Sequence, residues 1–269
     1  MTKPEQKSAM TKIIPPLVAH RGASHVAPEN TLPAYRRAFL EGADSVEGDF
    51  WLTADDQIVC IHDPTTKRTA PHQPVMDIRT SRLKELEHID VGLWKSTAYR
   101  GTPIPELTEI LNELPAGMKL YVEIKQNTPK IIDAMLLAAQ RSSINLSQLC
   151  LISFSEEIIQ RAKQRNPWLT AYLLHSLKPQ IWNLPAKNYL QKIIARAVAS
   201  GADGLDLGSG PLIDRWFVDS IRQAGLEFHV WTVNNADEAL RYIELGVDSI
   251  TTDRPQGLRL EITERLGRL

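Results

Sequence analysis

The chain has 269 residues, of which 43% are hydrophobic and 23% charged, and a formal net charge of −1. This composition is typical of a globular protein that buries a sizeable core. It argues against nucleic-acid binding, because no excess of Lys and Arg is available to neutralise a polyphosphate backbone. The length matches an α/β barrel, which folds as one unit, so we expect a single domain over residues 1–269.

The N-terminal part of the sequence carries charge instead of a long apolar run. Its first sixteen residues contain four charged side chains and lack the apolar core of a secretory signal peptide. No stretch approaches the roughly 18 apolar residues of a membrane-spanning helix. These features predict a cytoplasmic protein without a transmembrane segment. Cys60 and Cys150 lie in apolar runs without a metal-binding spacing, so we expect two buried free thiols.

Strand-like runs alternate with helical patterns along the chain. The expected strands are 17–20, 45–52, 119–123, 149–153, 169–173, 204–207, 227–232 and 249–252. Helices with an apolar spacing near 3.6 residues are expected at 31–40, 129–141, 156–164, 190–200, 215–224 and 236–245. A Gly-x-Asp pattern that ends a helix recurs at Gly42, Gly201 and Gly246. This alternation predicts a parallel (β/α)8 TIM barrel.

The second expected strand is followed by an antiparallel return strand, 57–62, across a turn at 53–56. A hairpin centred on this turn would place Asp49 opposite His62, with Glu47 on the same face as Asp49. A shift of one residue in the register would turn both carboxylates away from His62. The pairing is therefore a hypothesis that the structure can reject.

Residues 64–105 interrupt the alternation with five prolines, mixed charges and short apolar runs. The segment is too long for an ordinary connection. We interpret it as a small inserted subdomain, or lid over the barrel mouth, that follows the hairpin; a loose surface excursion is the alternative. A shorter irregular connection is expected at 176–188.

Carboxylates gather at the ends of the expected strands, where barrel enzymes carry their active sites. Glu47, Asp49 and Glu123 would form an all-oxygen anionic pocket, which suits Mg²⁺ or Ca²⁺ better than Zn²⁺. Surface salt bridges are the alternative for such residues. Their position inside apolar strands favours a metal site, because an unpaired charge is costly there.

Two histidines, His20 and His62, end apolar runs on either side of the Glu47 and Asp49 pair. One imidazole can accept a proton from an attacking oxygen while the other, as imidazolium, protonates a departing alcoholate. A single histidine at a strand end could have a purely structural role. The presence of two histidines beside two carboxylates favours a catalytic role.

Cationic and aromatic side chains complete the expected pocket. Arg21 and Lys125 would hold phosphate oxygens and stabilise the charge of the transition state, and an ordinary salt bridge is the alternative for Arg21. Phe154 and Trp231 could wall the part of the pocket that binds an alcohol, or could be core residues. Gly22 leaves room for a close backbone approach.

Asn30 and Thr31 are expected to cap the helix at 31–40.

Taken in order, these residues resemble the glycerophosphodiester phosphodiesterases. The matching segments are Val18–Gly22, Pro28–Thr31, Val46–Asp49, Leu52–Thr53, Ile61–Asp63, Arg68–Thr69, Glu123–Lys125, Ser153–Phe154, Val230–Asn234 and Thr252–Asp253. Two positions depart from the family pattern. Gly48 replaces an apolar residue, which we expect to point away from the ligands, and Gln57 replaces a turn glycine.

The resemblance implies a TIM barrel with an insertion after His62 and a divalent cation, Mg²⁺ or Ca²⁺, held by Glu47, Asp49 and Glu123. It also implies His20 and His62 as the acid–base pair. The implied substrate is a small glycerophosphodiester from deacylated phospholipids, hydrolysed to glycerol 3-phosphate and an alcohol, as in lipid and glycerol metabolism. The choice of cation and alcohol, a cyclic phosphate or direct attack by water, and the oligomeric state remain open.

Two alternatives to this activity are considered. A lysophospholipase D, or a relative of the phosphatidylinositol-specific phospholipases C, would need an apolar rim, which Trp94 and Tyr99 could supply. A barrel that binds phosphorylated ligands without catalysis would normally lack one of the metal ligands or histidines, and all of them are present in this sequence.

Overall fold

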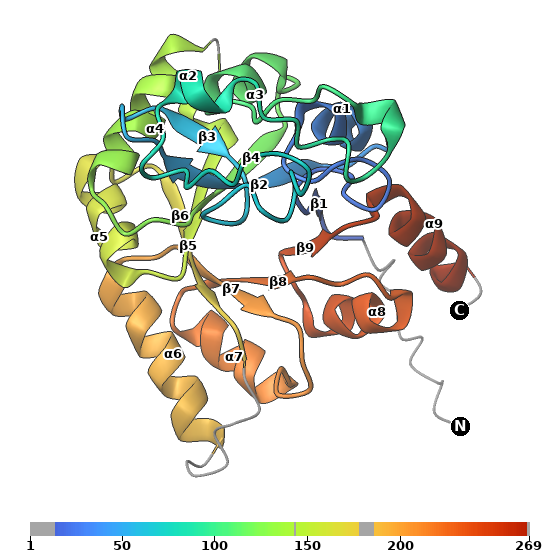
Figure 1. Cartoon of the computed structure of the whole chain (residues 1–269). Helices are drawn as coiled ribbons and strands as arrows, with labels where there is room; N and C mark the ends of the chain where they lie inside the picture. Colours follow the sequence, from blue (N-terminus) through green and yellow to red (C-terminus); the bar gives the residue numbers. More distant parts are fainter. Residues whose placement is uncertain (1–13, 143, 178–185, 268–269) are drawn as a thin grey trace, which may run out of the picture.

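The structure is a computed structural model that describes residues 14–142, 144–177 and 186–267. Its parallel strands form a closed ring surrounded by helices (Figure 1). The strands of the ring are β1 (Leu17–Ala19), β2 (Ser45–Leu52), β4 (Lys119–Ile124), β5 (Leu149–Ser153), β6 (Thr170–His175), β7 (Gly204–Gly208), β8 (Glu227–Trp231) and β9 (Ser249–Thr252). Strand β1 pairs with β9 on one side and β2 on the other, which closes the ring. The predicted TIM barrel is confirmed.

Helices cover the outside of the barrel (Figure 1). Those near their predicted positions are α1 (Leu32–Leu40), α4 (Lys130–Arg141), α5 (Glu156–Arg165), α7 (Arg215–Gln223) and α8 (Ala236–Leu245). The sequence patterns do not predict α2 (Leu83–Leu86), α3 (Leu107–Glu113), α9 (Pro255–Leu266) or the 3₁₀ turns η1 (Thr97–Tyr99) and η2 (Leu146–Gln148). Helix α6 (Ala186–Ser200) begins inside the connection predicted at 176–188, and residues 178–185 of that connection lie outside the described residues. So do the N-terminal residues 1–13.

Glycine ends the helix before three barrel strands, as the repeated pattern predicts. Gly42, Gly201 and Gly246 have φ values of 70°, 75° and 82°. Glycine adopts this left-handed conformation at little cost, so the chain can leave the helix and turn at once into the strand. The Asp two residues later accepts a hydrogen bond from a strand N–H in each case: Asp44 from Leu17, Asp203 from Ala171 and Asp248 from Phe228.

Side chains fill the barrel interior below the open end. One buried cluster there contains Tyr121, Cys150 and Tyr172, and His229 stacks on Tyr172 with 4.1 Å between ring centroids. Both cysteines, Cys60 and Cys150, are buried free thiols as predicted. Because this layer is packed, polar side chains at the carboxyl ends of the strands face an open mouth and not a continuous pore.

The hairpin forms, but the predicted register is wrong by one residue. Strand β3 (Ile58–Cys60) pairs Phe50 with Cys60, and the N–H of Ile61 donates to the carbonyl of Asp49. Asp49 therefore lies opposite Ile61 and not His62.

The turn explains the difference in register. The N–H of Thr53 donates to the carbonyl of Gln57, so three residues lie between this pair, where the prediction assumed an even number. Asp56 has a φ of 57°, the left-handed conformation that a turn of this length requires and that Asp tolerates better than most residues. The left-handed position is thus Asp56, and Gln57 already belongs to the paired part of the hairpin.

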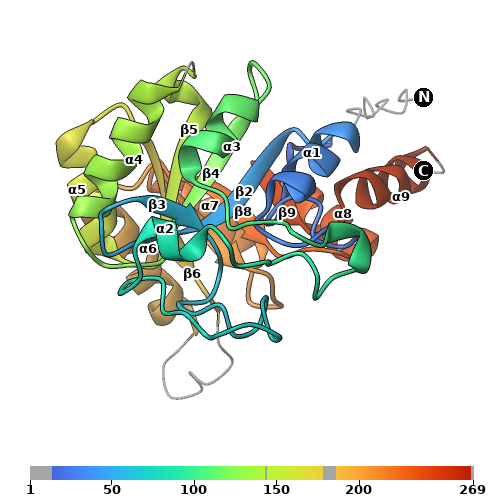
Figure 2. The ribbon, with the colours of Figure 1, turned by 45° about the horizontal axis from the view of Figure 1, so that its top comes forward.

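The segment 64–105 packs against the hairpin (Figure 2), on the face that carries Asp49 and not on the outer face, which meets the helices. Its buried side chains form a small cluster with three residues of β2, β3 and the following loop: Trp51, Val59 and Ile61 contact Ala70, Ile78, Leu86, Ile89, Val91 and Ile104. Two further contacts tie the segment to the loop after β1. Lys95 Nζ donates to the carbonyl of Ser24 at 2.7 Å, and Tyr99 Oη donates to that of Val26 at 3.2 Å.

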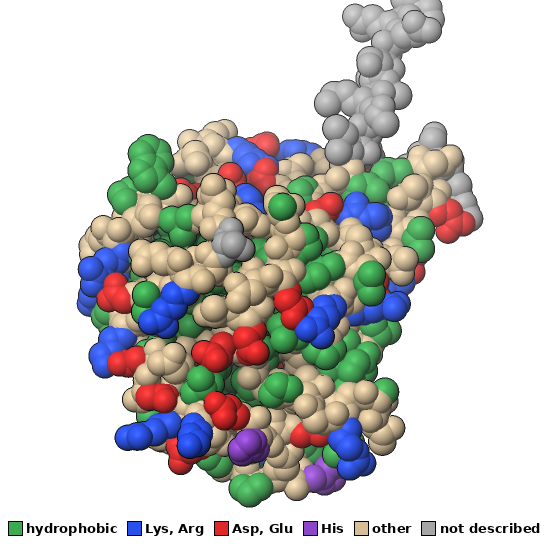
Figure 3. Space-filling view, turned by 90° about the horizontal axis from the view of Figure 1, so that it is seen from above, with side chains coloured by type: hydrophobic (Ala, Val, Ile, Leu, Met, Phe, Trp, Pro, Cys, Tyr) green, Lys and Arg blue, Asp and Glu red, His purple; other side chains and the backbone are tan. Residues whose placement is uncertain are grey.

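Charges of both signs are interspersed on the face of the molecule seen in Figure 3. Blue and red side chains lie beside one another there and do not gather into a basic stripe of the kind that binds nucleic acid. Within the described part of the chain, no helix combines the length and the hydrophobicity that crossing a membrane would require.

Candidate active site

Three carboxylates meet at the open end of the barrel, as the sequence predicts. Glu47 and Asp49 project from the same face of β2, and Asp49 pairs in register with Glu123 of the neighbouring strand β4. One carboxylate oxygen from each residue lies within 4.8 Å of the other two. The register error in the hairpin does not affect this cluster, because its geometry depends on the parallel pairing of β2 with β4.

The cluster is buried and electrostatically strained. Burial, with the charges of Asp49 and Glu123, raises the pKa of Glu47 well above its usual range. Burial and the charge of Asp49 likewise raise the pKa of Glu123 to about 7. For Asp49 burial acts in the same direction, but Arg21 and Lys125 outweigh it and hold the pKa of that carboxyl well below its usual value.

Two carboxylate oxygens of the cluster lack hydrogen-bond donors. Glu47 Oε1 and Asp49 Oδ1 are buried and have no hydrogen-bond partner, although Lys125 Nζ lies 3.2 Å from Asp49 Oδ1. Glu47 Oε2 accepts a hydrogen bond from the N–H of Arg21 at 2.9 Å. Three close carboxylates, two of them with an unpartnered buried oxygen, are the donor set of a hard divalent cation such as Mg²⁺ or Ca²⁺, so the residues present fit such an ion.

Asn30 supports the cluster, which corrects its predicted role. Thr31 is the N-cap of α1, as predicted, and its Oγ accepts from the N–H of Ala34. Asn30 instead directs its side chain to Asp49: Nδ2 donates to Asp49 Oδ2 at 2.8 Å, and Oδ1 accepts from the Asp49 N–H at 3.1 Å. Its φ of 58°, which Asn tolerates, turns the side chain away from the helix.

Gly48, which departs from the family pattern, and Gly22, which matches it, both lie where a neighbouring group leaves no room for a side chain. A Cβ added to Gly48 would lie 2.1 Å from Tyr35 Oη, so the absence of a side chain on the face away from the ligands admits the Tyr35 hydroxyl. That hydroxyl donates to Asn30 Oδ1 at 3.4 Å, behind the cluster. A Cβ on Gly22 would lie 2.6 Å from the Ala34 carbonyl carbon, so the close backbone approach expected at Gly22 is an approach to α1.

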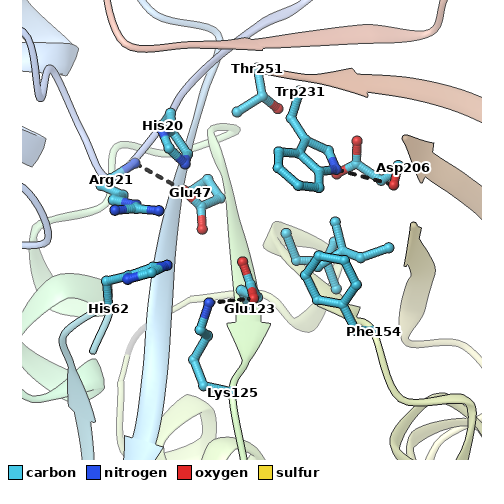
Figure 4. A pocket seen from close by; sticks show the side chains of 12 residues that line it. His20, Arg21, Glu47, His62, Glu123, Lys125, Phe154, Asp206, Trp231 and Thr251 are labelled. Carbon is cyan, nitrogen blue, oxygen red and sulfur yellow. Dashed lines mark hydrogen bonds and ion pairs between the residues drawn. The ribbon is translucent and has the colours of Figure 1, made fainter. Parts of the chain in front are cut away.

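Each of the two histidines is held by a carboxylate at its Nδ1. His20 Nδ1 lies 2.7 Å from Asp253 Oδ1, and His62 Nδ1 lies 2.6 Å from Asp63 Oδ1. Both residues line the pocket, which leaves Nε2 of each ring as the nitrogen available to a ligand (Figure 4). His62 reaches the pocket despite the shifted register because β3 ends at Cys60, so the alternation of a strand no longer applies two residues later.

The carboxylates behind the histidines are themselves held in place. Asp253 also accepts from Ser24 Oγ at 3.0 Å and from Asn234 Nδ2 at 2.6 Å. Burial would raise the pKa of Asp253, but these bonds and the His20 ring outweigh it and lower the pKa to about 2. Asp253 is therefore ionised at neutral pH and fixes the orientation of the His20 ring.

A corresponding network supports the second histidine. Arg68 Nε donates to Asp63 Oδ2 at 2.8 Å, and the same guanidinium contacts Glu29 at 2.7 and 2.9 Å. Glu29 in turn accepts from Arg21 Nη1 at 3.0 Å. The chain of ion pairs thus connects Arg21 in the loop after β1 with His62 after β3.

The predicted cations lie in the pocket in contact with the cluster. Arg21 Nε is 3.1 Å from Asp49 Oδ2, and Lys125 Nζ is 2.8 Å from Glu123 Oε1. The salt bridge considered as the alternative for Arg21 is present. It does not remove Arg21 from the pocket wall, because both Arg21 and Lys125 line the cavity.

The opposite wall of the pocket is aromatic (Figure 4). Phe154 and Trp231 make a T-shaped contact with 5.9 Å between ring centroids. Both line the cavity, together with Ile152 and Leu174, and Phe154 is 45% exposed. These two aromatic side chains are therefore part of the pocket wall and not plain core.

Several residues of the site carry no predicted role. The family resemblance covers the positions of four of them but does not predict which residues they contact: Asp253, Arg68, Glu29 and Asn234. Asp206 of β7 also lines the pocket, and its only signal in the sequence is a charged residue inside an apolar strand.

Comparisons with known proteins agree with this geometry. Residues 20–257 match the sequence model of the Glycerophosphoryl diester phosphodiesterase family. A glycerophosphodiester phosphodiesterase of Caldanaerobacter subterraneus is 29% identical over 257 residues, covering 90% of this chain and 95% of that protein. The lysophospholipase D GDPD1 of Homo sapiens is 24% identical over 265 residues, covering 90% and 84%. A phosphodiesterase of Oleispira antarctica, solved in complex with the product sn-glycerol-3-phosphate, superimposes with a TM-score of 0.79 at 27% identity, covering 93% of this chain and 97% of that one.

Proposed function

This chain belongs to the glycerophosphoryl diester phosphodiesterase family, and from that membership we propose that it hydrolyses small glycerophosphodiesters to glycerol 3-phosphate and an alcohol. We propose a divalent cation, Mg²⁺ or Ca²⁺, at Glu47, Asp49 and Glu123, with His20 and His62 as the acid–base pair. The observation that carries the proposal is the buried carboxylate cluster, with unpartnered oxygens, between two imidazoles.

The cation would supply charge that screens and polarises the phosphate. The protein's own contribution begins with Arg21 and Lys125, which lie beside the cluster and can hold phosphate oxygens through charge-assisted hydrogen bonds. Both cations are held before the substrate binds, because Arg21 forms ion pairs with Asp49 and Glu29, and Lys125 forms ion pairs with Asp49 and Glu123. Such a preorganised site can stabilise the charge that develops on the phosphate in the transition state.

The two imidazoles would move the protons. With Nδ1 bound to a carboxylate, each ring presents Nε2 to the cavity. One ring would take the proton of the attacking oxygen, which is either water or the 2-hydroxyl of the glycerol moiety, and the other would protonate the leaving alcohol. The network that holds Asp253 and Asp63 keeps both rings in this orientation.

Substrate choice provides the first test of the proposed function. Purified enzyme with Mg²⁺ or Ca²⁺ should hydrolyse glycerophosphocholine with a kcat/KM at least about ten times that for lysophosphatidylcholine, because the cavity offers an acyl chain only four apolar side chains, those of Ile152, Phe154, Leu174 and Trp231, and most of the chain would remain in water. Production of choline from each substrate measures the ratio. Turnover of the lysolipid alone would instead establish a lysophospholipase D, the activity in the name of the GDPD1 relative.

The side chains that could form an apolar rim for a lysolipid, Trp94 and Tyr99, make other contacts in this structure. Trp94 Nε1 donates to the carbonyl of Val91 at 2.8 Å, and Tyr99 binds the carbonyl of Val26. The residues that line the cavity include neither of them. Small soluble diesters are therefore the first choice of substrate.

The activity should depend on pH with a bell-shaped profile of kcat/KM, because one histidine must be neutral and the other protonated. Burial lowers the pKa of His62, and the opposing pull of Asp49 does not cancel it. The ionisation of His62 in the free enzyme therefore falls on the acid side of 6.5. Initial rates at low substrate concentration between about pH 5 and 9 measure the profile. A flat profile would contradict catalysis by two histidines.

The domain organisation of the chain is also proposed. We propose that residues 1–269 form one domain and that residues 64–105 are an insertion that closes over the barrel mouth. The contacts of Lys95 and Tyr99 with the loop after β1 support a position near the mouth. The cytoplasmic location expected from the N-terminal composition stays a prediction.

A further inference from the structure

We propose that Asp206 is a specificity-determining residue that binds the terminal hydroxyl of the substrate's glycerol moiety. The inference rests on the proposed function and deepens it, because it assigns one wall of the pocket to one arm of the diester.

Asp206 is an unusual residue for the interior of a barrel. In β7, Leu205 and Leu207 belong to the core between barrel and helices, and the alternate positions are Gly204, Asp206 and Gly208. Asp206 is therefore the one side chain that β7 directs into the barrel, at a level where branched apolar residues usually pack. It is 2% exposed, and its Oδ1 has no hydrogen-bond partner.

A buried carboxyl oxygen without a partner destabilises the protein unless a ligand completes its hydrogen bonds. The surroundings of Asp206 indicate where that ligand lies. Asp206 lines the same cavity as the two histidines, on the wall of Trp231 and Phe154 (Figure 4). Trp231 Nε1 donates to the main-chain carbonyl of Asp206 at 3.2 Å, so the indole is fixed beside the carboxyl.

The two walls of the cavity differ in chemistry. Figure 4 places His20, Arg21, His62 and Lys125 on one side and the aromatic pair with Asp206 on the other. The cationic wall attracts the phosphate, which leaves the aromatic wall for the carbon skeleton of an ester arm. An aromatic face beside a carboxyl suits a short polyol, whose C–H groups pack on the ring while a hydroxyl meets the carboxyl.

The position of Asp206 favours the glycerol arm over the alcohol arm. The alcohol varies among glycerophosphodiesters and must leave to solvent, whereas glycerol is common to all of them. Asp206 is buried deep in the cavity, while Phe154 is 45% exposed at its rim. Burial, with the charge of Glu123, raises the pKa of Asp206 to about 8, so the carboxyl can both donate to and accept from a hydroxyl at neutral pH.

The proposal is tested by combining substitutions of Asp206 with removal of the terminal hydroxyl from the substrate. We would compare glycerophosphoethanolamine with the analogue that carries propane-1,2-diol in place of glycerol and so lacks only the terminal hydroxyl. The wild type should prefer the glycerol compound by about 10- to 100-fold in kcat/KM. In Asp206→Leu the preference should fall to near unity, and Asp206→Asn, whose amide can also donate and accept, should keep most of it. A preference that survives in Asp206→Leu, or equal losses on both substrates, overturns the proposal.

Binding measurements separate this proposal from the proposed function. Calorimetric titration with glycerol 3-phosphate and with the phosphate of propane-1,2-diol gives the same ratio without turnover. If the wild type binds glycerol 3-phosphate more tightly and Asp206→Leu does not, the assignment of Asp206 holds even for a protein that hydrolyses no diester. Equal binding of the two phosphates by the wild type refutes it even if the enzyme is active.

Two controls exclude other roles. If Asp206 instead bound a cationic alcohol, Asp206→Asn would lose activity towards glycerophosphoethanolamine but not towards glycerophosphoglycerol, which would overturn the proposal. Asp206→Leu should melt at or above the wild-type temperature, because it removes an unpartnered buried carboxyl; a purely structural Asp206 would give a lower value. Asp219→Leu, a matched change at an exposed position of α7, should leave the substrate preference unchanged.

Discussion

Chelation with EDTA is expected to lower the turnover of glycerophosphodiesters by about 10³-fold, and addition of Mg²⁺ or Ca²⁺ should restore it. The reason lies in the cluster of Glu47, Asp49 and Glu123, in which one oxygen from each carboxylate lies within 4.8 Å of the other two. Without a cation, the three groups cannot all be ionised at low cost, and the phosphate would meet negative charge. Initial rates of glycerol 3-phosphate release before and after metal addition measure the effect. Full activity of metal-free protein would contradict the proposed mechanism.

Thermal unfolding provides a second readout of the cation. The pKa of Glu123 in the folded protein is raised to about 7 from 4.5, so its contribution to stability is present below 4.5 and is lost as the pH rises through about 7. The melting temperature in EDTA should therefore fall over that range. A bound cation favours the ionised cluster, so Ca²⁺ or Mg²⁺ should raise the melting temperature most at the upper end.

The variant Glu47→Gln separates the two readouts. It removes one of the charges, so it should melt at or above the wild-type temperature in EDTA but gain little from added metal, and its turnover should fall by about 10²-fold or more. Glu157→Gln removes a carboxylate from the exposed surface of α5 and serves as the matched control. A Glu47→Gln enzyme with normal metal-dependent stabilisation would exclude Glu47 as a ligand.

The sequence predicts the barrel well because the barrel depends on patterns that are local. Apolar runs mark the strands, helical periodicity and glycines such as Gly42 and Gly246 mark most of the helices between them, and the closing pair of β1 with β9 needs no further signal. The three carboxylates could be brought together for the same reason, since Asp49 and Glu123 occupy the ends of adjacent parallel strands.

The details that the sequence does not predict depend on single backbone angles and distant contacts. The hairpin register follows from the left-handed Asp56, which any of several turn residues could have adopted. Asn30 looks like a helix cap because it precedes one, and only the fold brings Asp49 within reach of its amide. The bond of His20 to Asp253 joins residues 233 positions apart, so no local pattern could reveal it.

Replacement of either histidine should reduce kcat by about 10²- to 10⁴-fold with a much smaller change in KM, because proton transfer occurs in the transition state. His20→Ala with His62→Ala should cost less than the product of the two single losses, since the rings act as a unit. Both variants should keep the melting temperature shift caused by Ca²⁺, which shows that the cluster is intact. His88→Ala, an exposed histidine of the segment 64–105, is the matched control.

A substrate with a better leaving group can assign the two roles. When the alcohol is p-nitrophenol, its departure needs little protonation, so the variant that lacks the general acid should recover most of its activity on the p-nitrophenyl ester of glycerol phosphate. The variant that lacks the general base should remain impaired, because the attacking oxygen must still lose its proton. The asymmetric recovery identifies which of His20 and His62 protonates the alcohol. Equal recovery of both variants, or no recovery of either, would refute the division of labour between the two rings.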